Sequence, residues 1–195
     1  MTHAATPEAF RVEVPRKSES RILAALAAVE IALGLVLARS GVRFDGFLDV
    51  HRPNADAVPF GMALLDQAAG LLVGVVVAVA LVRVWRPHVR WSAVALVIAL
   101  ARLPLVICAP AVLAMPPADT IARMASAPLS DPAPLIVLLG LVGAGGVFGC
   151  IAVLAIGLRR ITGARGWTLA ALTFAILAIA EIVGKLVLAS AIRIS

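Results

Sequence analysis

Apolar residues run in five long stretches along the chain, and short polar stretches separate them. Each apolar stretch is near the roughly 20 residues that an α-helix needs to cross a bilayer. The sequence therefore predicts an all-α, polytopic membrane bundle with five transmembrane helices. Their expected ranges are Arg21–Ala38, Pro59–Val84, Trp91–Met115, Pro134–Leu158 and Trp167–Ile192.

The composition agrees with a membrane protein and leaves no room for a separate soluble domain. Of the 195 residues, 62% are hydrophobic and 14% are charged, whereas a soluble domain has about 45–50% apolar and about 25% charged residues. We expect residues 1–20 to form a flexible cytoplasmic tail and residues 21–195 to form a single five-helix transmembrane domain. The net charge of +6 comes without any nucleic-acid-binding motif, so nucleic acid is not an expected partner.

The distribution of Lys and Arg predicts the orientation of the bundle. With a cytoplasmic N-terminus, the cytoplasmic set is Arg11, Arg16, Lys17, Arg21, Arg83, Arg86, Arg90, Arg159, Arg160 and Arg165. The smaller outer set is Arg39, Arg43, Arg52, Arg123 and Arg193. Because cytoplasmic loops carry the excess of Lys and Arg, the N-terminus is expected inside and the C-terminus outside. The three tryptophans agree, since they fall at predicted cytoplasmic helix ends: Trp85, Trp91 and Trp167.

The lengths of the loops predict which helices are neighbours. The cytoplasmic loops Trp85–Arg90 and Arg159–Gly166 are short, so they should pair the second helix with the third and the fourth with the fifth. The outer loops, residues 39–58 and 116–133, are longer and mix apolar with charged residues. We expect both outer loops to lie across the outer face of the bundle.

Charged residues inside the predicted helices are the strongest candidates for a polar site. A charge at mid-membrane costs roughly 2.5–3.5 kcal/mol on insertion scales, so these residues should pair in the bundle interior. By depth, Arg102 is expected to pair with Glu30 or Glu181, and Asp66 with Lys185. Glu181 and Lys185 lie four residues apart on one face, which should contact the second and third helices. The candidate network is Glu30, Asp66, Gln67, Arg102, Glu181 and Lys185.

Two prolines in the third predicted helix add a second feature. Pro104 and Pro110 each remove a backbone donor, which predicts kinks and free carbonyl groups. Irregular backbone at membrane depth normally faces protein or water. We therefore expect Arg102 to line a cavity that opens outward. A functional polar site and a purely structural role for the charges both remain open from the sequence.

Small residues in the second and fourth helices are interpreted as packing positions. Glycine permits close approach of helix backbones in membranes, and the candidates are Gly70, Gly74, Gly140, Gly143, Gly145, Gly146 and Gly149. Cys108 and Cys150 are expected at depths that differ by roughly 10–15 Å, which is too far for a disulfide.

The sequence predicts neither a cofactor nor a metal. His3, His51 and His88 lie outside the predicted helices, which excludes a membrane-embedded haem held by paired histidines. Asp45, Asp49 and His51 carry metal-ligating atoms in the first outer loop, but their spacing matches no strong ligand motif. No nucleophile–base pair or redox dithiol is recognisable either, so an enzyme ranks last among the functions considered.

The first three predicted helices resemble the DoxX family of small bacterial membrane proteins. The resemblance covers about residues 21–100 and consists of Arg21 at the start of the first helix, Asp66 followed by Gly70 in the second, a Leu-rich continuation, and Arg83. The chain departs from the family in having five helices instead of four and Asp instead of Glu at position 66. The resemblance implies a bacterial inner membrane location and a quinone-linked redox or assembly role.

Two functional hypotheses follow. The first is a non-enzymatic subunit or assembly factor of a larger inner-membrane complex, whose partners are other membrane subunits or further copies of this chain. The second is a proton or small-molecule conduit that uses the buried charges. No inverted repeat supports the conduit.

Overall fold

The computed structural model describes residues 16–53, 56–116, 120 and 134–192. Within these residues five helices are long and apolar enough to cross a membrane: Ser18–Ala38, Phe60–Trp85, Trp91–Leu113, Ile136–Thr162 and Gly166–Ala191. The predictions of an all-α fold and of five candidate transmembrane helices are confirmed. Residues 1–15 of the predicted tail lie outside the described residues, and the first helix begins at Arg16, five residues earlier than expected.

The helices follow the predicted ranges closely, with one break. They are α1 (Arg16–Ala38), α2 (Phe60–Trp85), α3 (Trp91–Cys108), α4 (Pro110–Leu113), α6 (Pro134–Thr162) and α7 (Gly166–Ile192). Pro104 lies inside α3, which continues to Cys108, and the break falls at Ala109, immediately before Pro110. Proline is well placed at the first position of a helix, where its missing N–H has no partner to lose.

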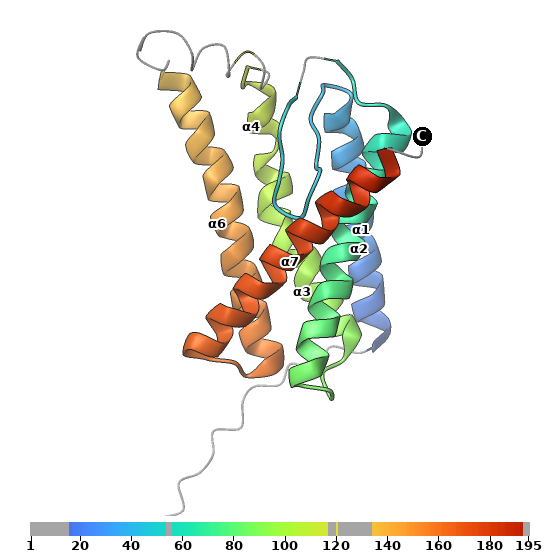
Figure 1. Cartoon of the computed structure of the whole chain (residues 1–195), viewed down its shortest axis with the longest axis vertical. Coiled ribbons are helices and arrows are strands. Elements are labelled where there is room, and N and C mark those ends of the chain that lie inside the picture. Colours follow the sequence, from blue (N-terminus) through green and yellow to red (C-terminus); the bar gives the residue numbers. More distant parts are fainter. Residues whose placement is uncertain (1–15, 54–55, 117–119, 121–133, 193–195) are drawn as a thin grey trace, which may run out of the picture.

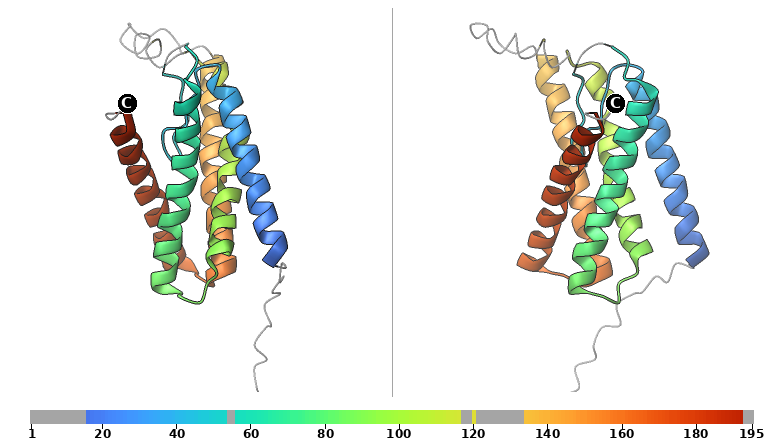
Figure 2. Two further views of the ribbon diagram at one scale, coloured as in Figure 1. Left: turned by 90° about the vertical axis from the view of Figure 1, so that its right-hand side faces the viewer. Right: turned by 45° about the vertical axis from the view of Figure 1, so that its right-hand side comes forward.

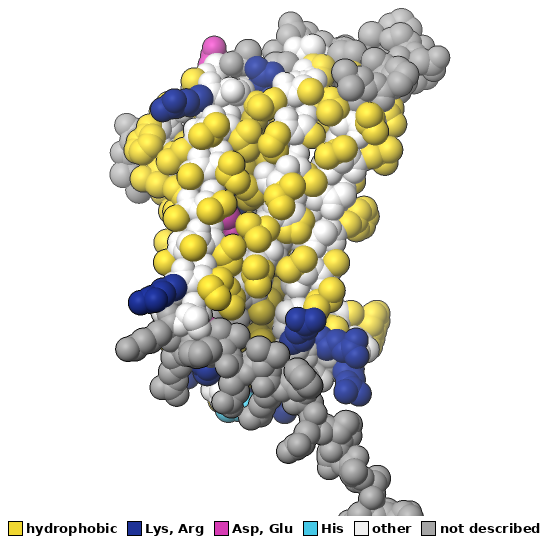
Figure 3. All heavy atoms as spheres, turned by 180° about the vertical axis from the view of Figure 1, so that it is seen from behind, with side chains coloured by type: hydrophobic (Ala, Val, Ile, Leu, Met, Phe, Trp, Pro, Cys, Tyr) yellow, Lys and Arg dark blue, Asp and Glu magenta, His cyan; other side chains and the backbone are white. Residues whose placement is uncertain are grey.

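The two ends of the bundle differ (Figure 1). One end, called the turn end here, carries the short α2–α3 and α6–α7 connections. The opposite end, called the loop end, carries the long α1–α2 connection. Gly163 and Gly166 adopt positive φ values in the α6–α7 turn, a conformation that glycine accepts at little cost. Seen from behind, a band of hydrophobic side chains separates Lys and Arg residues at the two ends (Figure 3).

Helix α3 lies at the centre of the bundle. Half of the most apolar part of its span is buried inside the chain, compared with 11% for α6. Helices α1, α2 and α6 pack against α3, while α7 packs mainly against α2 and less closely against its sequence neighbour α6 (Figure 2). The predicted neighbours are therefore in contact, and α7 and α2 form an additional extensive interface.

Two of the predicted packing glycines of α6 support its interface with α3, and three do not. A Cβ atom at Gly149 would lie 2.8 Å from Cβ of Pro104, and one at Gly146 would lie 3.0 Å from Cβ of Cys108. Nothing lies within 4 Å of the corresponding positions of Gly140, Gly143 and Gly145. The packing prediction is wrong for these three among the described contacts, because Gly140 and Gly145 are exposed and Gly143 borders the cavity beside α3 instead of touching it.

Residues 41–51 of the α1–α2 loop enter the bundle instead of crossing its outer face. Gly41 reverses the chain after α1 with a φ of 82°. Arg43 and His51 then pair through two backbone hydrogen bonds of 2.8 and 3.1 Å, which makes residues 43–51 a hairpin. The hairpin descends between the helices (Figure 1), and the side chain of Phe47 at its tip is completely buried. The expectation of a loop on the outer face is wrong here, because Phe44 and Phe47 bury their rings inside the bundle.

The position of Phe47 depends on Gly74 of α2. A Cβ atom at Gly74 would lie 2.5 and 2.6 Å from two carbon atoms of the Phe47 ring. We predict that Gly74→Ala destabilises the protein by about 1–3 kcal/mol, the usual cost of overpacking a core, as measured by unfolding in detergent. Gly140→Ala is the matched control, since it adds the same methyl group to a helix with open space around it. Equal stability of the two variants would contradict the insertion of Phe47 against α2.

Candidate functional site

The innermost charged pair joins α1 and α3. Arg102 Nε lies 3.3 Å from Glu30 Oε2, and both side chains are almost completely buried. The guanidinium carbon of Arg102 lies 5.5 Å from the centre of the Phe47 ring, within the range of a cation–π contact. Of the two partners predicted for Arg102, the structure selects Glu30. The Arg102–Glu30 pair lies in the bundle interior, directly beside the tip of the hairpin.

Asp66 of α2 pairs with Arg43 of the hairpin, and not with Lys185 as predicted. Arg43 Nε and Nη2 donate to the two carboxylate oxygens of Asp66 at 3.0 and 2.9 Å. This bidentate geometry is the strong form of an Arg–carboxylate pair, and it raises the pKa of Arg43. The prediction failed because Arg43 was assigned to an outer loop. The sequence signal that this loop is buried was its apolar residues, among them Val42, Phe44 and Phe47.

Glu181 and Lys185 of α7 face the hairpin. Glu181 Oε2 accepts a hydrogen bond of 2.9 Å from the backbone N–H of Leu48. Lys185 Nζ lies 2.7 Å from Asp49 Oδ2 and 3.3 Å from Glu181 Oε1, so the predicted pair along the helix is present. Helix α7 packs mainly on α2, but the contact of the Glu181–Lys185 face itself with α2 stays a prediction.

The hairpin tip separates Glu181 from Arg102. A Cβ atom at Gly46 would lie 2.4 Å from Glu181 Oε1, and one at Gly70 of α2 would lie 2.8 Å from the Gly46 carbonyl oxygen and 2.3 Å from Arg102 Nη1. Gly46 therefore occupies the space between the two charges. The predicted contact of the Glu181 face with the third helix is replaced by this contact with the hairpin.

Gln67 and the prolines play smaller parts than predicted. The Gln67 side chain packs against Gly34 of α1, and its Oε1 atom is buried without a hydrogen-bond partner. A cavity of about 250 Å³ does lie beside the α3–α4 break. Arg102 is fully buried and does not line this cavity, which corrects the prediction. The lining includes Leu48, Asp49, Leu105, Cys108, Val112 and Gly143.

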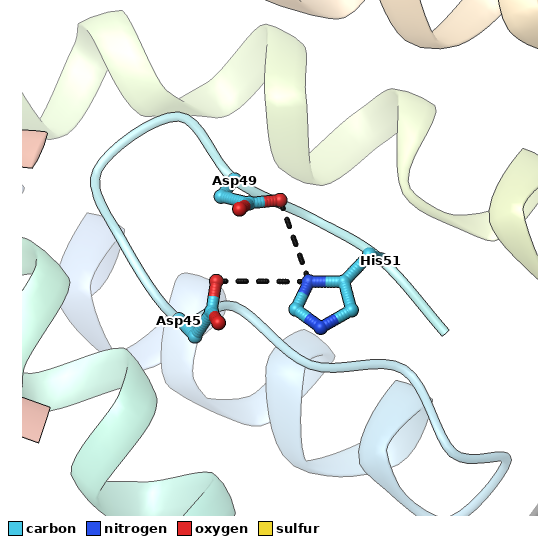
Figure 4. A group of neighbouring side chains, drawn as sticks. All are labelled: Asp45, Asp49 and His51. Atoms are coloured by element: carbon cyan, nitrogen blue, oxygen red, sulfur yellow. Dashed lines mark ion pairs between the residues drawn. The ribbon is translucent and has the colours of Figure 1, made fainter. Parts of the chain in front are cut away.

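The hairpin also brings together the three side chains of the first outer loop whose metal-ligating atoms the sequence analysis named without a recognisable ligand motif. Asp45, Asp49 and His51 point toward one another (Figure 4). His51 Nδ1 lies 3.4 Å from Asp49 Oδ1 and 3.6 Å from Asp45 Oδ1. Each of the three side chains is about one third exposed.

Burial and the contacts among these three side chains shift their pKa values. Asp49 raises the pKa of His51, while His51 and, less strongly, Lys185 lower the pKa of Asp49. Burial raises the pKa of Asp45. The cluster therefore holds one carboxylate that stays ionised to low pH beside an imidazole and a second carboxyl group.

A further ion pair lies at the turn end. Glu19 of α1 pairs with Arg90, which precedes α3, and accepts a hydrogen bond of 2.9 Å from Ser92 Oγ. Sequence reasoning missed this pair because Glu19 was assigned to the flexible tail. Cys108 and Cys150 are both free, as predicted.

No protein-family model, curated protein or solved structure matches the chain. The resemblance to the DoxX family therefore stays a prediction that rests on the residues of the first three helices.

The pairing of Asp66 with Arg43 instead of Lys185 can be tested by measurement. We predict that a double-mutant cycle with Arg43→Gln and Asp66→Asn gives a coupling free energy of about 0.5–3 kcal/mol, as expected for residues in contact. The same cycle with Lys185→Gln and Asp66→Asn should give a coupling close to zero, because Lys185 contacts Asp49 and Glu181. The free energies come from unfolding in detergent. Stronger coupling of Asp66 to Lys185 than to Arg43 would contradict the observed pairing.

Proposed function

We propose that the protein is a non-enzymatic subunit or assembly factor of a larger complex in a bacterial inner membrane. This proposal rests on the contacts that the predicted intramembrane charges make. Arg102 pairs with Glu30, Asp66 with Arg43, and Glu181 accepts from the Leu48 backbone while contacting Lys185. The Arg43–Asp66 pair and the Leu48–Glu181 hydrogen bond hold a hairpin inside the bundle, which is a structural task, and the Arg102–Glu30 ion pair joins α1 to α3 beside it.

The conduit hypothesis finds less support. Between Phe47 and the turn end, the described interior is filled by apolar side chains of α2, α3, α6 and α7. Buried members of this core include Val82, Val94, Ile98, Leu154, Leu158 and Ile176. A moving ion needs polar groups or water along its whole path, and in this part of the described chain the core is apolar. A partner-binding scaffold is the simpler function for such a bundle.

Helix α6 is the element that fits best against another subunit. It is the least buried of the five candidate spans. Gly140 and Gly145 have open space around them, and Ala144 between them is exposed. Small residues at exposed positions let a second transmembrane helix approach closely, so α6 supports the proposal of a partner within the membrane.

A comparison of partner binding and proton flux tests the proposed function. The protein is purified from native membranes with its partners and is also reconstituted alone into liposomes. We expect a defined membrane partner to co-purify and proton flux to stay at the level of empty liposomes. Glu181→Gln, which keeps an oxygen acceptor for Leu48 N–H, should retain the partner.

Two outcomes would overturn the proposal. Proton flux through the wild type that Glu181→Gln abolishes would establish the conduit instead. A wild type that shows neither a partner nor flux would exclude both functions.

We also propose that the turn end faces the cytoplasm. The α2–α3 and α6–α7 connections with their adjacent helix ends contribute Arg83, Arg86, Arg90, Arg159, Arg160 and Arg165. The α1–α2 connection at the loop end contributes only Arg39, Arg43 and Arg52, so the distribution of Arg supports this orientation. Alkaline phosphatase fused after Ser195 should be active, and the same enzyme inserted in the α2–α3 turn should be inactive. The reverse pattern of activities would invert the topology.

A further inference from the structure

The hairpin carries three potential metal ligands in a compact arrangement. The ligand atoms of Asp45, Asp49 and His51 all lie within 4.8 Å of one another. Ligands about 2.0–2.1 Å from a tetrahedral ion are separated by about 3.4 Å. The distances from His51 Nδ1 to the two carboxylates, 3.4 and 3.6 Å, match this separation. Little movement is therefore needed for the three groups to surround one ion (Figure 4).

Two of these ligand atoms are buried without a hydrogen-bond partner. They are Asp45 Oδ1 and His51 Nδ1. Buried side-chain oxygen and nitrogen atoms normally have a partner, and the separations of 3.4 and 3.6 Å exceed those of good hydrogen bonds. A cation between these atoms accepts both lone pairs at once. This observation is independent of the clustering itself, because it concerns how the atoms are satisfied.

The surroundings orient the ligands. Lys185 Nζ binds Asp49 Oδ2 at 2.7 Å, which leaves Asp49 Oδ1 directed at His51. The backbone pairing of Arg43 with His51 closes the hairpin, and Asp45 and Asp49 lie on its two arms between these paired residues, near His51. Outer contacts of this kind hold ligands in position and are part of a working metal site. The site holds the carboxylates of Asp45, Asp49 and nearby Glu181 and only one lysine, Lys185. Its local charge is therefore negative, which favours a divalent cation.

We propose that Asp45, Asp49 and His51 bind a divalent transition-metal ion of the zinc class at the loop end. The imidazole ligand favours such an ion over Mg²⁺ and Ca²⁺, which prefer oxygen ligands alone. Three protein ligands leave a coordination position for solvent, and the partial exposure of all three side chains gives the ion access. The site does not depend on the proposed role as a subunit.

Zinc binding to the full-length protein tests the proposal. The protein is prepared without a polyhistidine tag, which would itself bind metal, and a chelator removes bound metal in detergent. The protein is then titrated with Zn²⁺ alone in competition with a chromophoric chelator. We expect one Zn²⁺ per chain. His51→Gln and Asp45→Asn should each weaken binding at least tenfold, since even loss of an outer contact costs about 10–100-fold. His88→Gln, which removes an exposed histidine in the α2–α3 turn, is the matched control and should leave the affinity unchanged.

The variants are chosen so that misfolding does not imitate loss of a ligand. Asp45→Asn preserves the shape of the side chain and leaves the Lys185–Asp49 pair intact. Its unfolding temperature without metal should equal that of the wild type, while Zn²⁺ should raise the unfolding temperature of the wild type only. Absence of stoichiometric Zn²⁺ binding, unchanged affinity in both ligand variants, or equal affinity for Mg²⁺ would overturn the proposal.

Discussion

The anchoring of the α1–α2 hairpin inside the helix bundle is the constraint on which the rest of this structure depends. Backbone groups that leave regular secondary structure at membrane depth need partners in the protein. The hairpin meets this need with its own backbone pairing between Arg43 and His51, and with the bond from Leu48 N–H to Glu181. The bidentate pair of Arg43 with Asp66 fastens the same segment to α2. The pair with Arg43 therefore explains why the otherwise apolar helix α2 carries Asp66.

The buried charges and the glycines are parts of one arrangement. Gly74 leaves room for Phe47, and Gly46 leaves room for the Glu181 carboxylate. Phe47 in turn covers Arg102, whose charge is balanced by Glu30. Breaking a buried pair by removing one partner typically costs 3–5 kcal/mol, so loss of either Arg102 or Glu30 should destabilise the bundle. This mutual dependence favours a structural interpretation of the network over one in which the charges move ions.

The two proposals concern opposite sides of the hairpin. Its tip contributes to the closed interior and so supports the role of the bundle as a scaffold. Its more exposed part, with Asp45, Asp49 and His51, faces the loop end, where a metal ion is accessible. The two regions meet at α7, where Glu181 contacts the tip and Lys185 contacts Asp49. A metal ion at this position adds a cross-link within the hairpin and reinforces the same anchoring.

The sequence by itself determined the helices and the positions of the charges along them, because the length of an apolar stretch and the place of a charge within it are local properties of the chain. It also correctly limited Arg102 to two acids, one of which is its partner. Only the tertiary structure decided the partners of Asp66 and Lys185, and the gathering of Asp45, Asp49 and His51. Hydropathy averages over a segment, and residues 39–58 mix charges with phenylalanines, so their average resembles an exposed loop. Whether such a segment lies on the bundle or enters it depends on groups from distant helices, Asp66 and Glu181, which satisfy it only after the helices have packed.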